Sequence, residues 1–525
     1  MKRFQAALTA LAAAAALGSA LLAPMAAQAA PGDRARVIVA YKGGSSDAVR
    51  AAVQRLGGRV LVDLEDLDAV AVSVPRSALA ALRALRGVDY VEDDIIQSID
   101  RVPGARRTTA VPQAGGTQVT PYGITQVQAD QITGTPAWRP KVCIVDSGIH
   151  GTHEDLAGNT MKGKNFVNSG SWNTDEGAHG SHVAGTIAAL DNTVGVVGVG
   201  GNKQFDLIIA KVFDAAGSSA SSIITKGIRY CGNQGANVIN MSLGSSSNSR
   251  TQQRALDSLA AKGVLLIASA GNGGTSALNY PAALASVMSV AAHDVNLQTA
   301  SFSQFNADVE ISGPGVDVVS TVPPNVLLKG AATVGGTPYA VLGMEGSPVT
   351  SATGPLADFG FGDTPAAGSM AGKVCLISRG NISFADKVLN CQNSGGIGAI
   401  VYNNTAGPLA GTLGTTVTTI PSVGATQADG ALMLAQVGQS ATVAVEPDPA
   451  LYASFNGTSM SAPHVTGVAA LVWSYYPSCT AEQIRTSLKL SALDMGAAGR
   501  DDFSGAGAVQ AKAAFDRIAA LGCGN

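Results

Sequence analysis

The sequence predicts an α/β fold with a mainly parallel sheet and helices on both of its faces. Strand-like runs alternate with segments of helical length between residues 141 and 292. The 525 residues are 46% hydrophobic and only 14% charged, which provides apolar material for several cores. The 63 glycines lie among aliphatic runs that recur along the chain, a composition typical of a loop-rich enzyme and not of a disordered protein.

The elements of this region are expected to alternate between strand and helix. Apolar, β-branched runs predict strands at 141–146, 207–213, 238–243, 264–269 and 287–292, and the patterns between them predict helices from His179, near 219–231 and at 250–262. Successive parallel strands need crossover connections, so this order implies right-handed crossovers with helices on both faces.

Two titratable residues stand where such a sheet forms its ligand crevice. Asp146 ends the strand-like run 141–146, and the carboxyl ends of parallel strands border the crevice. His179 begins the small-residue segment 179–186. Taken alone, such an aspartate more often caps a turn and such a histidine more often sits satisfied in a core.

A serine stands at the start of a third element. Ser459 lies where a small-residue turn enters the apolar run 465–473. The first N–H groups of a helix point at any anion that forms beside such a hydroxyl. The plainer interpretation is that Thr458 or Ser459 only caps a buried helix. The joint presence of Asp, His and Ser at element ends favours nucleophilic catalysis.

The segments VDSG, HGSHVAGT and GTSMSAPH resemble the signature blocks of the subtilisin-like serine proteases, the subtilases. The resemblance extends over residues 117–325 and 446–525 and implies the subtilisin-like three-layer sandwich. It also implies a catalytic triad of Asp146, His179 and Ser459 that hydrolyses peptide bonds through an acyl-enzyme.

Other roles depend on this resemblance. Asn272 follows the strand at 264–269 and could simply occupy a turn, but the resemblance implies that it stabilises the oxyanion. His182 and His464 are implied to be structural. The strand end around Leu243 could run into a turn, or it could pair with an extended peptide and so tolerate many sequences. The implied substrate-binding residues are Ser242, Leu243, Gly244, Gly217, Ser218, Ser269, Gly271 and Asn279.

The pocket for the residue before the scissile bond is expected between Gly244 and Gly271. These small walls predict a roomy, largely apolar pocket, which Asn279 would narrow or make more polar.

The loop 190–196 follows the helix that begins at His179 and could be an ordinary connection. It could also turn several carbonyl groups toward a hard cation, and oxygen ligands suit calcium. The ligand set that the resemblance implies is Gln118, Asp155, Leu190, Asn192, Val194 and Val196. The expected calcium is structural, and no cofactor is expected for the chemistry.

Residues 1–29 have the pattern of a secretory signal peptide. Lys2 and Arg3 precede an Ala/Leu-rich run that ends at Ala27-Gln28-Ala29. A membrane anchor is the alternative, but residues such as Pro24 interrupt the apolar run, and the uninterrupted part is too short to cross a membrane. We therefore expect a secreted, extracellular protein.

Residues 33–99 read as strand, helix, strand, strand, helix, strand, which is a ferredoxin-like α+β order. The segments are 36–41, 46–56, 60–64, 69–74, 76–85 and 88–96. An unrelated small domain would fit, but its place before a subtilase region makes residues 30–116 resemble an inhibitor-type propeptide and its linker. That resemblance implies a zymogen with its own propeptide as inhibitor. The basic linker 101–116 is the expected processing zone.

Residues 326–445 interrupt the subtilase pattern with strand, helix and strand segments. They resemble the protease-associated (PA) domain found in many secreted subtilases. No titratable cluster lies in this β-rich insert, so we expect it to gate or engage substrates without taking part in the chemistry.

Six cysteines in an exported chain favour disulfides. Local closure favours Cys375 with Cys391 and Cys479 with Cys523, which leaves Cys143 with Cys231. A free, buried Cys143 on a core strand is the alternative.

The composition argues against nucleic-acid binding, and one motif argues against an α/β-hydrolase esterase. A net charge of −3 and the lack of a basic cluster argue against nucleic acid, and a monomer without membrane contact is expected. An α/β-hydrolase esterase is a further alternative, but Ser461 occupies the position at which the nucleophile elbow of that fold needs glycine, which weakens it. A binding protein on an inactive subtilase scaffold remains the main alternative to a peptidase.

Overall fold

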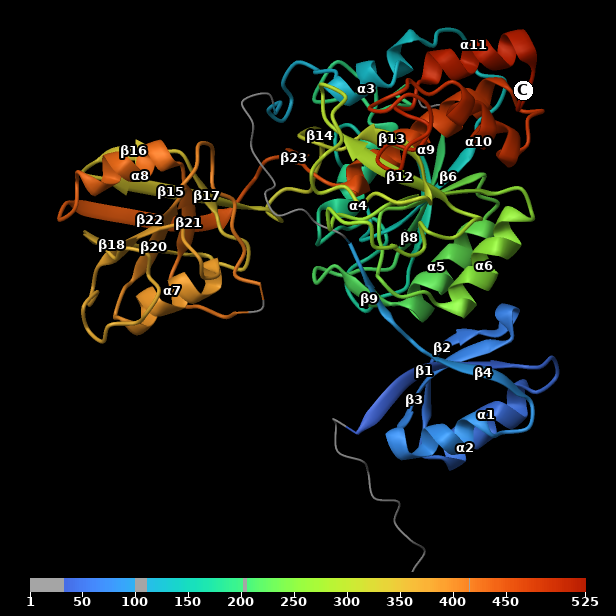
Figure 1. The fold of residues 1–525 in the computed structure, drawn as a ribbon, viewed down its shortest axis with the longest axis horizontal. Helices are drawn as coiled ribbons and strands as arrows, with labels where there is room; N and C mark the ends of the chain where they lie inside the picture. The colour runs from blue at the N-terminus through green and yellow to red at the C-terminus, as the bar shows by residue number, and fades with distance from the viewer. Residues whose placement is uncertain (1–32, 100–110, 202–204, 415) are drawn as a thin grey trace, which may run out of the picture.

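The computed structural model describes residues 33–99, 111–201, 205–414 and 416–525. Figure 1 shows a small N-terminal domain in blue, a large central domain, and a β-rich insert that leaves and rejoins the central domain. The expected signal peptide, and residues 101–110 of the expected processing zone, lie outside the described residues.

The central domain contains a seven-stranded sheet with the order β13-β12-β11-β10-β6-β8-β7, in which every neighbouring pair is parallel. The strands are β6 (Lys141–Asp146), β7 (Thr160–Asn165), β8 (Asp206–Lys211), β10 (Val238–Met241), β11 (Leu265–Ser269), β12 (Met288–His293) and β13 (Val309–Pro314). The predicted parallel sheet is confirmed. The edge strand β7 was not predicted, because its polar sequence TMKGKN lacks an apolar run.

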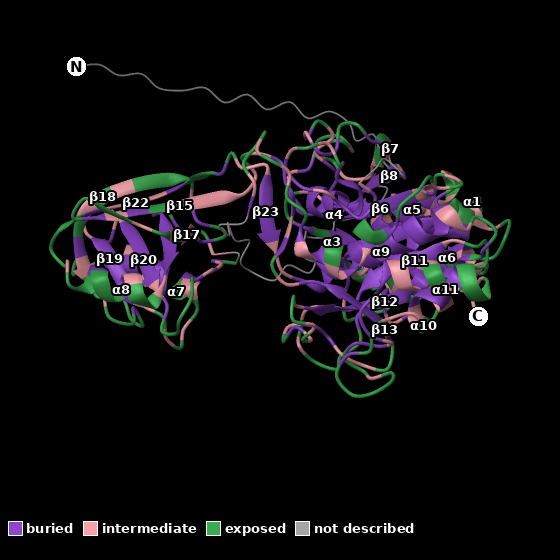
Figure 2. Ribbon diagram, turned by 90° about the horizontal axis from the view of Figure 1, so that it is seen from above, coloured by how far each residue is buried: buried purple, intermediate pink, exposed green. Residues whose placement is uncertain are grey.

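Helices cover both faces of this sheet, as the strand and helix order predicted. Alternate residues of β6 face opposite ways, so Ile144 packs in one core and Cys143 in the other. The first core holds α3 (Tyr122–Gln126), α4 (His179–Ala188), α9 (Thr458–Tyr475), α10 (Ala481–Leu490) and α11 (Ala511–Leu521). The second holds α5 (Ser221–Asn233) and α6 (Arg250–Ala260). Figure 2 shows the central strands in the colour of buried residues.

The N-terminal domain has the predicted order of strands and helices. Its antiparallel sheet β2-β3-β1-β4 contains β1 (Arg34–Tyr41), β2 (Arg59–Leu64), β3 (Ala69–Pro75) and β4 (Val88–Asp93), and its helices are α1 (Ser46–Arg55) and α2 (Leu79–Arg83). The strand predicted at 88–96 ends early at Asp93. The chain continues as β5 (Ile96–Ser98), which pairs with β9 (Ser218–Ala220) of the central domain.

The insert is built on an eight-stranded sheet with the order β16-β15-β22-β18-β19-β20-β21-β17. Its strands are β15 (Leu328–Val334), β16 (Thr337–Tyr339), β17 (Val341–Gly343), β18 (Thr350–Asp358), β19 (Val374–Ser378), β20 (Gly398–Tyr402), β21 (Ser422–Ala425) and β22 (Ser440–Pro447), with α7 (Phe384–Asn393) and α8 (Gln427–Leu434). The chain enters and leaves the insert beside β14 (Val318–Thr321) and β23 (Tyr452–Phe455), which pair with each other. β22 runs two residues past the expected boundary at 445.

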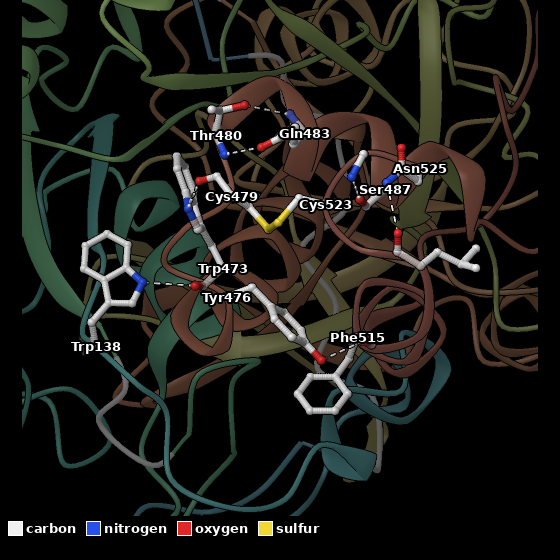
Figure 3. The surroundings of a disulfide bond; sticks show 12 residues. Trp138, Trp473, Tyr476, Cys479, Thr480, Gln483, Ser487, Phe515, Cys523 and Asn525 are labelled. Atoms are coloured by element: carbon white, nitrogen blue, oxygen red, sulfur yellow. Dashed lines mark hydrogen bonds between the residues drawn. A yellow bond between two sulfur atoms is a disulfide. The ribbon is translucent and has the colours of Figure 1, made fainter.

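All six cysteines form disulfides in the predicted pairs, so Cys143 is not free. Cys143–Cys231 joins β6 to α5, and Cys375–Cys391 joins β19 to α7 within the insert. Figure 3 shows Cys479–Cys523, which ties the end of the chain to the loop after α9, where the Trp473 indole donates to the Cys479 carbonyl. Among the described residues, no helix combines the length and apolar character needed to cross a membrane.

Candidate active site

Asp146 and His179 form a hydrogen-bonded pair at the carboxyl edge of the central sheet. Asp146 is the last residue of β6 and His179 the first of α4. His179 Nδ1 lies 2.8 Å from Asp146 Oδ1 and 3.0 Å from Oδ2, and both residues are buried. Because a carboxylate only accepts, Nδ1 carries the proton and Nε2 is the basic nitrogen. His179 Nε2 has no hydrogen-bond partner among the described residues.

Ser459 lies in the first turn of α9, as the sequence predicted. Gly457, with φ of 147°, turns the chain between β23 and this helix in a conformation that disfavours a side chain. Ser459 Oγ donates to the Ser242 carbonyl at 3.3 Å, and Ser242 Oγ donates to the Ser459 carbonyl at 2.9 Å. These two bonds hold the start of α9 against the end of β10.

Asn272 lies beside the residue that precedes Ser459. Its Oδ1 accepts from the Thr458 amide at 2.8 Å and from Thr458 Oγ1 at 2.9 Å. Thr458 Oγ1 in turn accepts from the Gly271 amide at 3.1 Å. Asp146 ends β6, and Ser242 and Asn272 come shortly after β10 and β11, which are the next two strands of the sheet.

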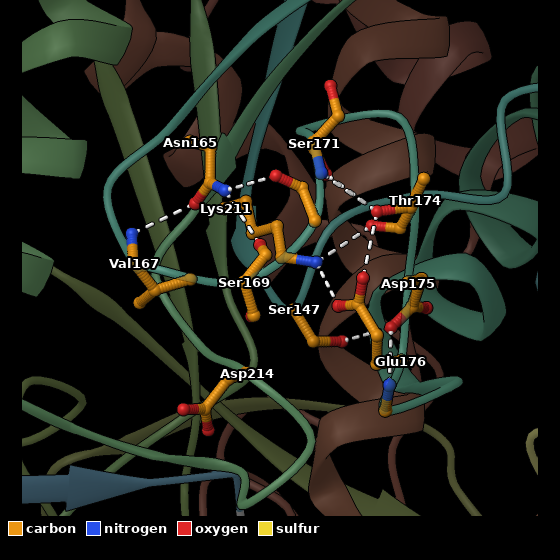
Figure 4. A network of polar contacts seen from close by, with 12 residues as sticks. Ser147, Asn165, Val167, Ser169, Ser171, Thr174, Asp175, Glu176, Lys211 and Asp214 are labelled. Carbon is orange, nitrogen blue, oxygen red and sulfur yellow. Dashed lines mark hydrogen bonds and ion pairs between the residues drawn. The ribbon is translucent and has the colours of Figure 1, made fainter.

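A second buried carboxylate, which the sequence analysis did not single out, holds the loop before His179 (Figure 4). Asp175 accepts from Ser147 Oγ at 2.8 Å, from the Gly177 amide at 3.0 Å, and from both the amide and hydroxyl of Ser181. The Ser147 amide donates to Asp146 at 2.7 Å. Ser147 therefore links the carboxylate of the candidate triad to the loop that carries His179.

A fully buried lysine anchors the same loop (Figure 4). Lys211, at the end of β8, donates from Nζ to the Thr174 carbonyl at 3.0 Å and pairs with Glu176. Burial acts to raise the pKa of Glu176, but hydrogen bonds from Lys211 and Thr174, together with the Lys211 charge, leave that pKa below its usual value. The only sequence signal for this anchor was a lysine closing the otherwise apolar strand LIIAK.

The tail of the N-terminal domain lies between the two segments predicted to bind substrate. Ser98 pairs with Ser218 on one side and with Gly244 on the other, with bonds of 3.0 and 2.9 Å between Ser98 and Gly244. The Ile99 amide donates to the Gly217 carbonyl at 2.9 Å. An extended segment thus adds a strand between these two backbone edges.

Two side-chain amides lie against the glycines of the expected specificity pocket. A Cβ added at Gly244 would lie 2.2 Å from Asn279 Nδ2, and one added at Gly271 would lie 1.9 Å from Gln304 Oε1. Asn279 is held by a 3.1 Å bond to the Ser269 carbonyl. Asn279 therefore lies where it would narrow the expected pocket or make it more polar, and Gln304 adds a second amide beside Gly271.

The loop 190–196 partly matches the expected calcium ligands. Among the described residues, no hydrogen bond ends on the carbonyl oxygens of Leu190, Val194 or Val196. Asp155 accepts from Asn192 Nδ2 at 3.1 Å and from the Val196 amide at 2.8 Å, and burial raises its pKa.

The remaining members of the expected calcium set are two side-chain amides. Gln118 Oε1 accepts from the Asn192 and Thr193 amides. The Asn192 side-chain oxygen accepts from the Val194 amide. The oxygen atoms of the set suit a hard cation, although those of Gln118 and Asn192 already accept hydrogen bonds from backbone amides of the loop. The described residues contain no cluster of three or more His, Cys, Asp or Glu that could hold a metal.

The other two histidines of the signature blocks are fully buried and contact backbone. His182 stacks on Phe455 with ring centroids 4.3 Å apart, and its Nε2 lies 3.0 Å from the Val318 carbonyl. His464 Nδ1 lies 2.8 Å from the Met460 carbonyl. Burial lowers the pKa of His182 to about 3 and that of His464 to about 4, so both are neutral at neutral pH.

Comparison with protein families gives matches over most of the chain. The Subtilase family matches residues 139–341 and 397–507, the PA domain matches residues 348–433, and a peptidase inhibitor domain matches residues 10–94. The subtilase match covers more than half of the sequence.

Similar proteins are bacterial subtilisins and alkaline proteases. Subtilisin DY from Bacillus licheniformis is 44% identical over 214 residues, which are 40% of this chain and 77% of the relative. An alkaline protease from Alkalihalobacillus alcalophilus is 38% identical over 285 residues, 53% of this chain and 69% of the relative.

Solved structures agree with these relatives. The psychrophilic subtilisin-like protease Apa1 from Pseudoalteromonas sp. AS-11 is 41% identical with a TM-score of 0.55, covering 78% of this chain and 100% of that one. Fervidolysin from Fervidobacterium pennivorans shares the fold at 22% identity, with a TM-score of 0.59, over 92% of this chain and 61% of its own. The chain therefore belongs to the subtilase family and is a serine endopeptidase with an inhibitor-type domain and an inserted PA domain.

Proposed function

We propose that Ser459, His179 and Asp146 hydrolyse peptide bonds of extended protein substrates by acyl transfer. His179 Nε2 takes the proton of Ser459 Oγ as the oxygen attacks the peptide carbonyl. His179 then donates this proton to the leaving amine, and the acyl-enzyme is hydrolysed by water that His179 activates. Asp146 fixes the imidazole orientation through Nδ1 and stabilises its positive charge.

The oxyanion of the tetrahedral intermediate would be stabilised by donors beside Ser459. Asn272 Nδ2 and the Ser459 backbone amide are the candidate donors, since Thr458 holds Asn272 Oδ1. Preoriented donors stabilise the transition state more than the ground state because the full negative charge appears only there.

The observation that carries this proposal is the Asp146–His179 hydrogen bond at the sheet edge where Ser459 and Asn272 also lie. An inactive scaffold would not need a buried carboxylate bonded to an imidazole at this edge of the sheet. The tail pairs with Gly217 and Gly244 through main-chain atoms alone, and a substrate that paired in the same way would use no side chain there, which supports a broad specificity.

The protein is made, in this proposal, as a secreted, monomeric zymogen whose N-terminal domain inhibits it. Asp94, a buried carboxylate of that domain, accepts from Ser221 Oγ and from the amide and hydroxyl of Ser222 at the start of α5. Arg36 pairs with the same carboxylate. Together with the tail in the cleft, these contacts support inhibition until the linker is cut.

A structural calcium ion completes the proposal. The carbonyls of Leu190, Val194 and Val196 with the Asp155 carboxylate would hold it, joined by the side chains of Gln118 and Asn192. The ion would stabilise the loop 190–196 after α4. No cofactor is proposed for the hydrolysis itself.

Hydrolysis of casein by the processed protein tests the function. Wild type is expected to cleave it, and Ser459→Ala and His179→Ala to lose activity by about a thousandfold or more. Asp175 and Lys211 remain in both variants, so the loop that carries residue 179 keeps its anchors. A folded wild-type protein that cleaves nothing would favour the inactive-scaffold alternative.

A further inference from the structure

One side chain of the inhibitory tail is completely buried in the central domain. Gln97 has no exposed surface, whereas its neighbour Ile96 is 57% exposed. Gln97 Nε2 donates to Gln252 Oε1 at 3.1 Å and to the Tyr280 carbonyl at 3.2 Å. Gln252 Nε2 donates back to Gln97 Oε1 at 2.7 Å. Both protons and the oxygen of the Gln97 amide therefore have partners.

The tail occupies the path that a substrate would follow to Ser459. Ser98 pairs antiparallel with Gly244, so a peptide that continued in this register would reach Ser242 two residues later. The Ser242 carbonyl lies 3.3 Å from Ser459 Oγ. The substrate residue opposite Ser242 therefore carries the scissile carbonyl, and the residue in the place of Gln97 is the fourth before the scissile bond.

We infer that Gln252 and the Tyr280 carbonyl form a subsite that selects glutamine as the fourth residue before the scissile bond. The inference rests on the proposed peptidase function and refines it. The NH2 group of a glutamine at this position donates to Gln252 Oε1 and to the Tyr280 carbonyl, and its oxygen accepts from Gln252 Nε2.

Other side chains would leave buried polar groups without partners. A leucine offers no hydrogen bond, so the buried side-chain amide of Gln252 would lose water without compensation, while the Tyr280 carbonyl would keep only its bond from the Ser245 amide. A glutamate would place its charge against the Gln252 oxygen and the Tyr280 carbonyl. An asparagine is one methylene too short to reach the same atoms. A site built to hydrogen-bond a substrate group discriminates strongly against analogues that lack it.

The helix that carries Gln252 holds it in place. Gln252 is 1% exposed and lies in the first turn of α6, where its amide bonds to the capping Ser249 Oγ at 3.2 Å. Tyr280 is fixed by backbone bonds of 3.0 and 2.8 Å with Ser245. The central domain itself therefore fixes the backbone of both partners.

The test uses the processed enzyme and internally quenched peptides that differ only at the fourth residue before the bond cleaved, with that bond mapped by mass spectrometry. The expected kcat/KM for glutamine exceeds that for leucine, glutamate and alanine by roughly tenfold or more. In Gln252→Leu this preference should reverse toward leucine. Gln253→Leu, one residue along the same helix, should keep the glutamine preference.

In Gln252→Leu the Gln97 side chain of the tail loses its partner amide, which could impair maturation. The double variant Gln97→Leu/Gln252→Leu removes both amides and is therefore tested as well. Equal kcat/KM for all four peptides, or a glutamine preference that survives in the Gln252 variants, would overturn the subsite while leaving the peptidase in place. Failure to cleave any of the peptides or casein would instead overturn the proposed function, and the subsite with it.

Discussion

Glu92 of the inhibitor-type domain accepts a 2.8 Å hydrogen bond from the backbone amide of Arg250, at the start of α6 in the central domain. The same carboxylate accepts from the Thr251 amide at 2.9 Å and from Ser249 Oγ at 3.1 Å. Its negative charge lies at the positive end of the helix dipole. One side chain from outside the helix thus satisfies donors that have no partner within it.

Replacing Glu92 by alanine should expose the start of α6. We expect amide exchange at Arg250 and Thr251 to rise by roughly fivefold or more, since a lost cap costs about 1 kcal/mol. The measurement is hydrogen exchange on the full chain carrying Ser459→Ala, which prevents autolysis. Asp93→Ala removes the neighbouring exposed carboxylate and should leave both amides protected. Unchanged exchange in Glu92→Ala would mean that Glu92 does not stabilise the start of α6.

Lys211→Met should loosen the loop that carries His179. The substitution keeps the volume but leaves the Thr174 carbonyl without its donor and Glu176 without its cation. We expect a loss of about 1 to 3 kcal/mol in stability and a lower kcat, because the position of His179 depends on this loop. Thermal unfolding and casein hydrolysis measure the two effects. The exposed Lys162→Met serves as the control and should change neither.

The sequence predicted the parts of the fold that depend on local pattern. Apolar runs located the central strands, and small-residue turns located Asp146, His179 and Ser459 at element ends. Local closure gave Cys375–Cys391 and Cys479–Cys523, and elimination gave Cys143–Cys231, whose cysteines are 88 residues apart. The strands, the element ends and the two local disulfides need only residues that are near one another in the chain, or a pattern with a fixed period.

The features that were missed depend on contacts between distant segments. Asp175 matters because Ser147 and Ser181 donate to it, and no local pattern distinguishes it from a loop carboxylate. Gln252 reads as an ordinary helix residue until Gln97, 155 positions earlier, lies against it. Gln304 was missed for the same reason, since no local pattern places its amide beside Gly271.

Acid should destabilise the protein through its buried histidines. Burial lowers the pKa of His293 to about 3, as it does for His182, and that of His464 to about 4, so the folded protein keeps them neutral. In the unfolded chain they take up protons below an ordinary value near 6.5. Stability is therefore full above that value and falls as the pH drops toward 4, by up to about 1.4 kcal/mol per pH unit for each histidine.

The melting temperature of the Ser459→Ala protein between pH 7.5 and 4.5 measures this loss. His293 contacts Ser312 Oγ at 2.8 Å and Gln126 Oε1 at 3.2 Å, and its replacement by glutamine should flatten the pH dependence. A melting temperature that rises as the pH falls, or a slope unchanged in His293→Gln, would contradict the assignment.

Calcium removal should lower the melting temperature of the same protein by several degrees. If the loop 190–196 holds the ion, loss of the carboxylate charge at Asp155 should remove the response to chelator. Asp155→Asn is therefore expected to melt at a lower temperature that chelator does not change. Asp191→Asn, on the same loop but outside the ligand set, should keep the response. A chelator effect of equal size in Asp155→Asn would exclude this site.

The most direct test of the peptidase mechanism is the position of a covalent label. A fluorophosphonate reacts only with a serine whose hydroxyl is activated by a neighbouring base. After reaction of the processed protein, peptide mass spectrometry should find the adduct on Ser459, and His179→Ala should abolish the labelling. An adduct on any other residue, or full labelling without His179, would contradict the proposed triad.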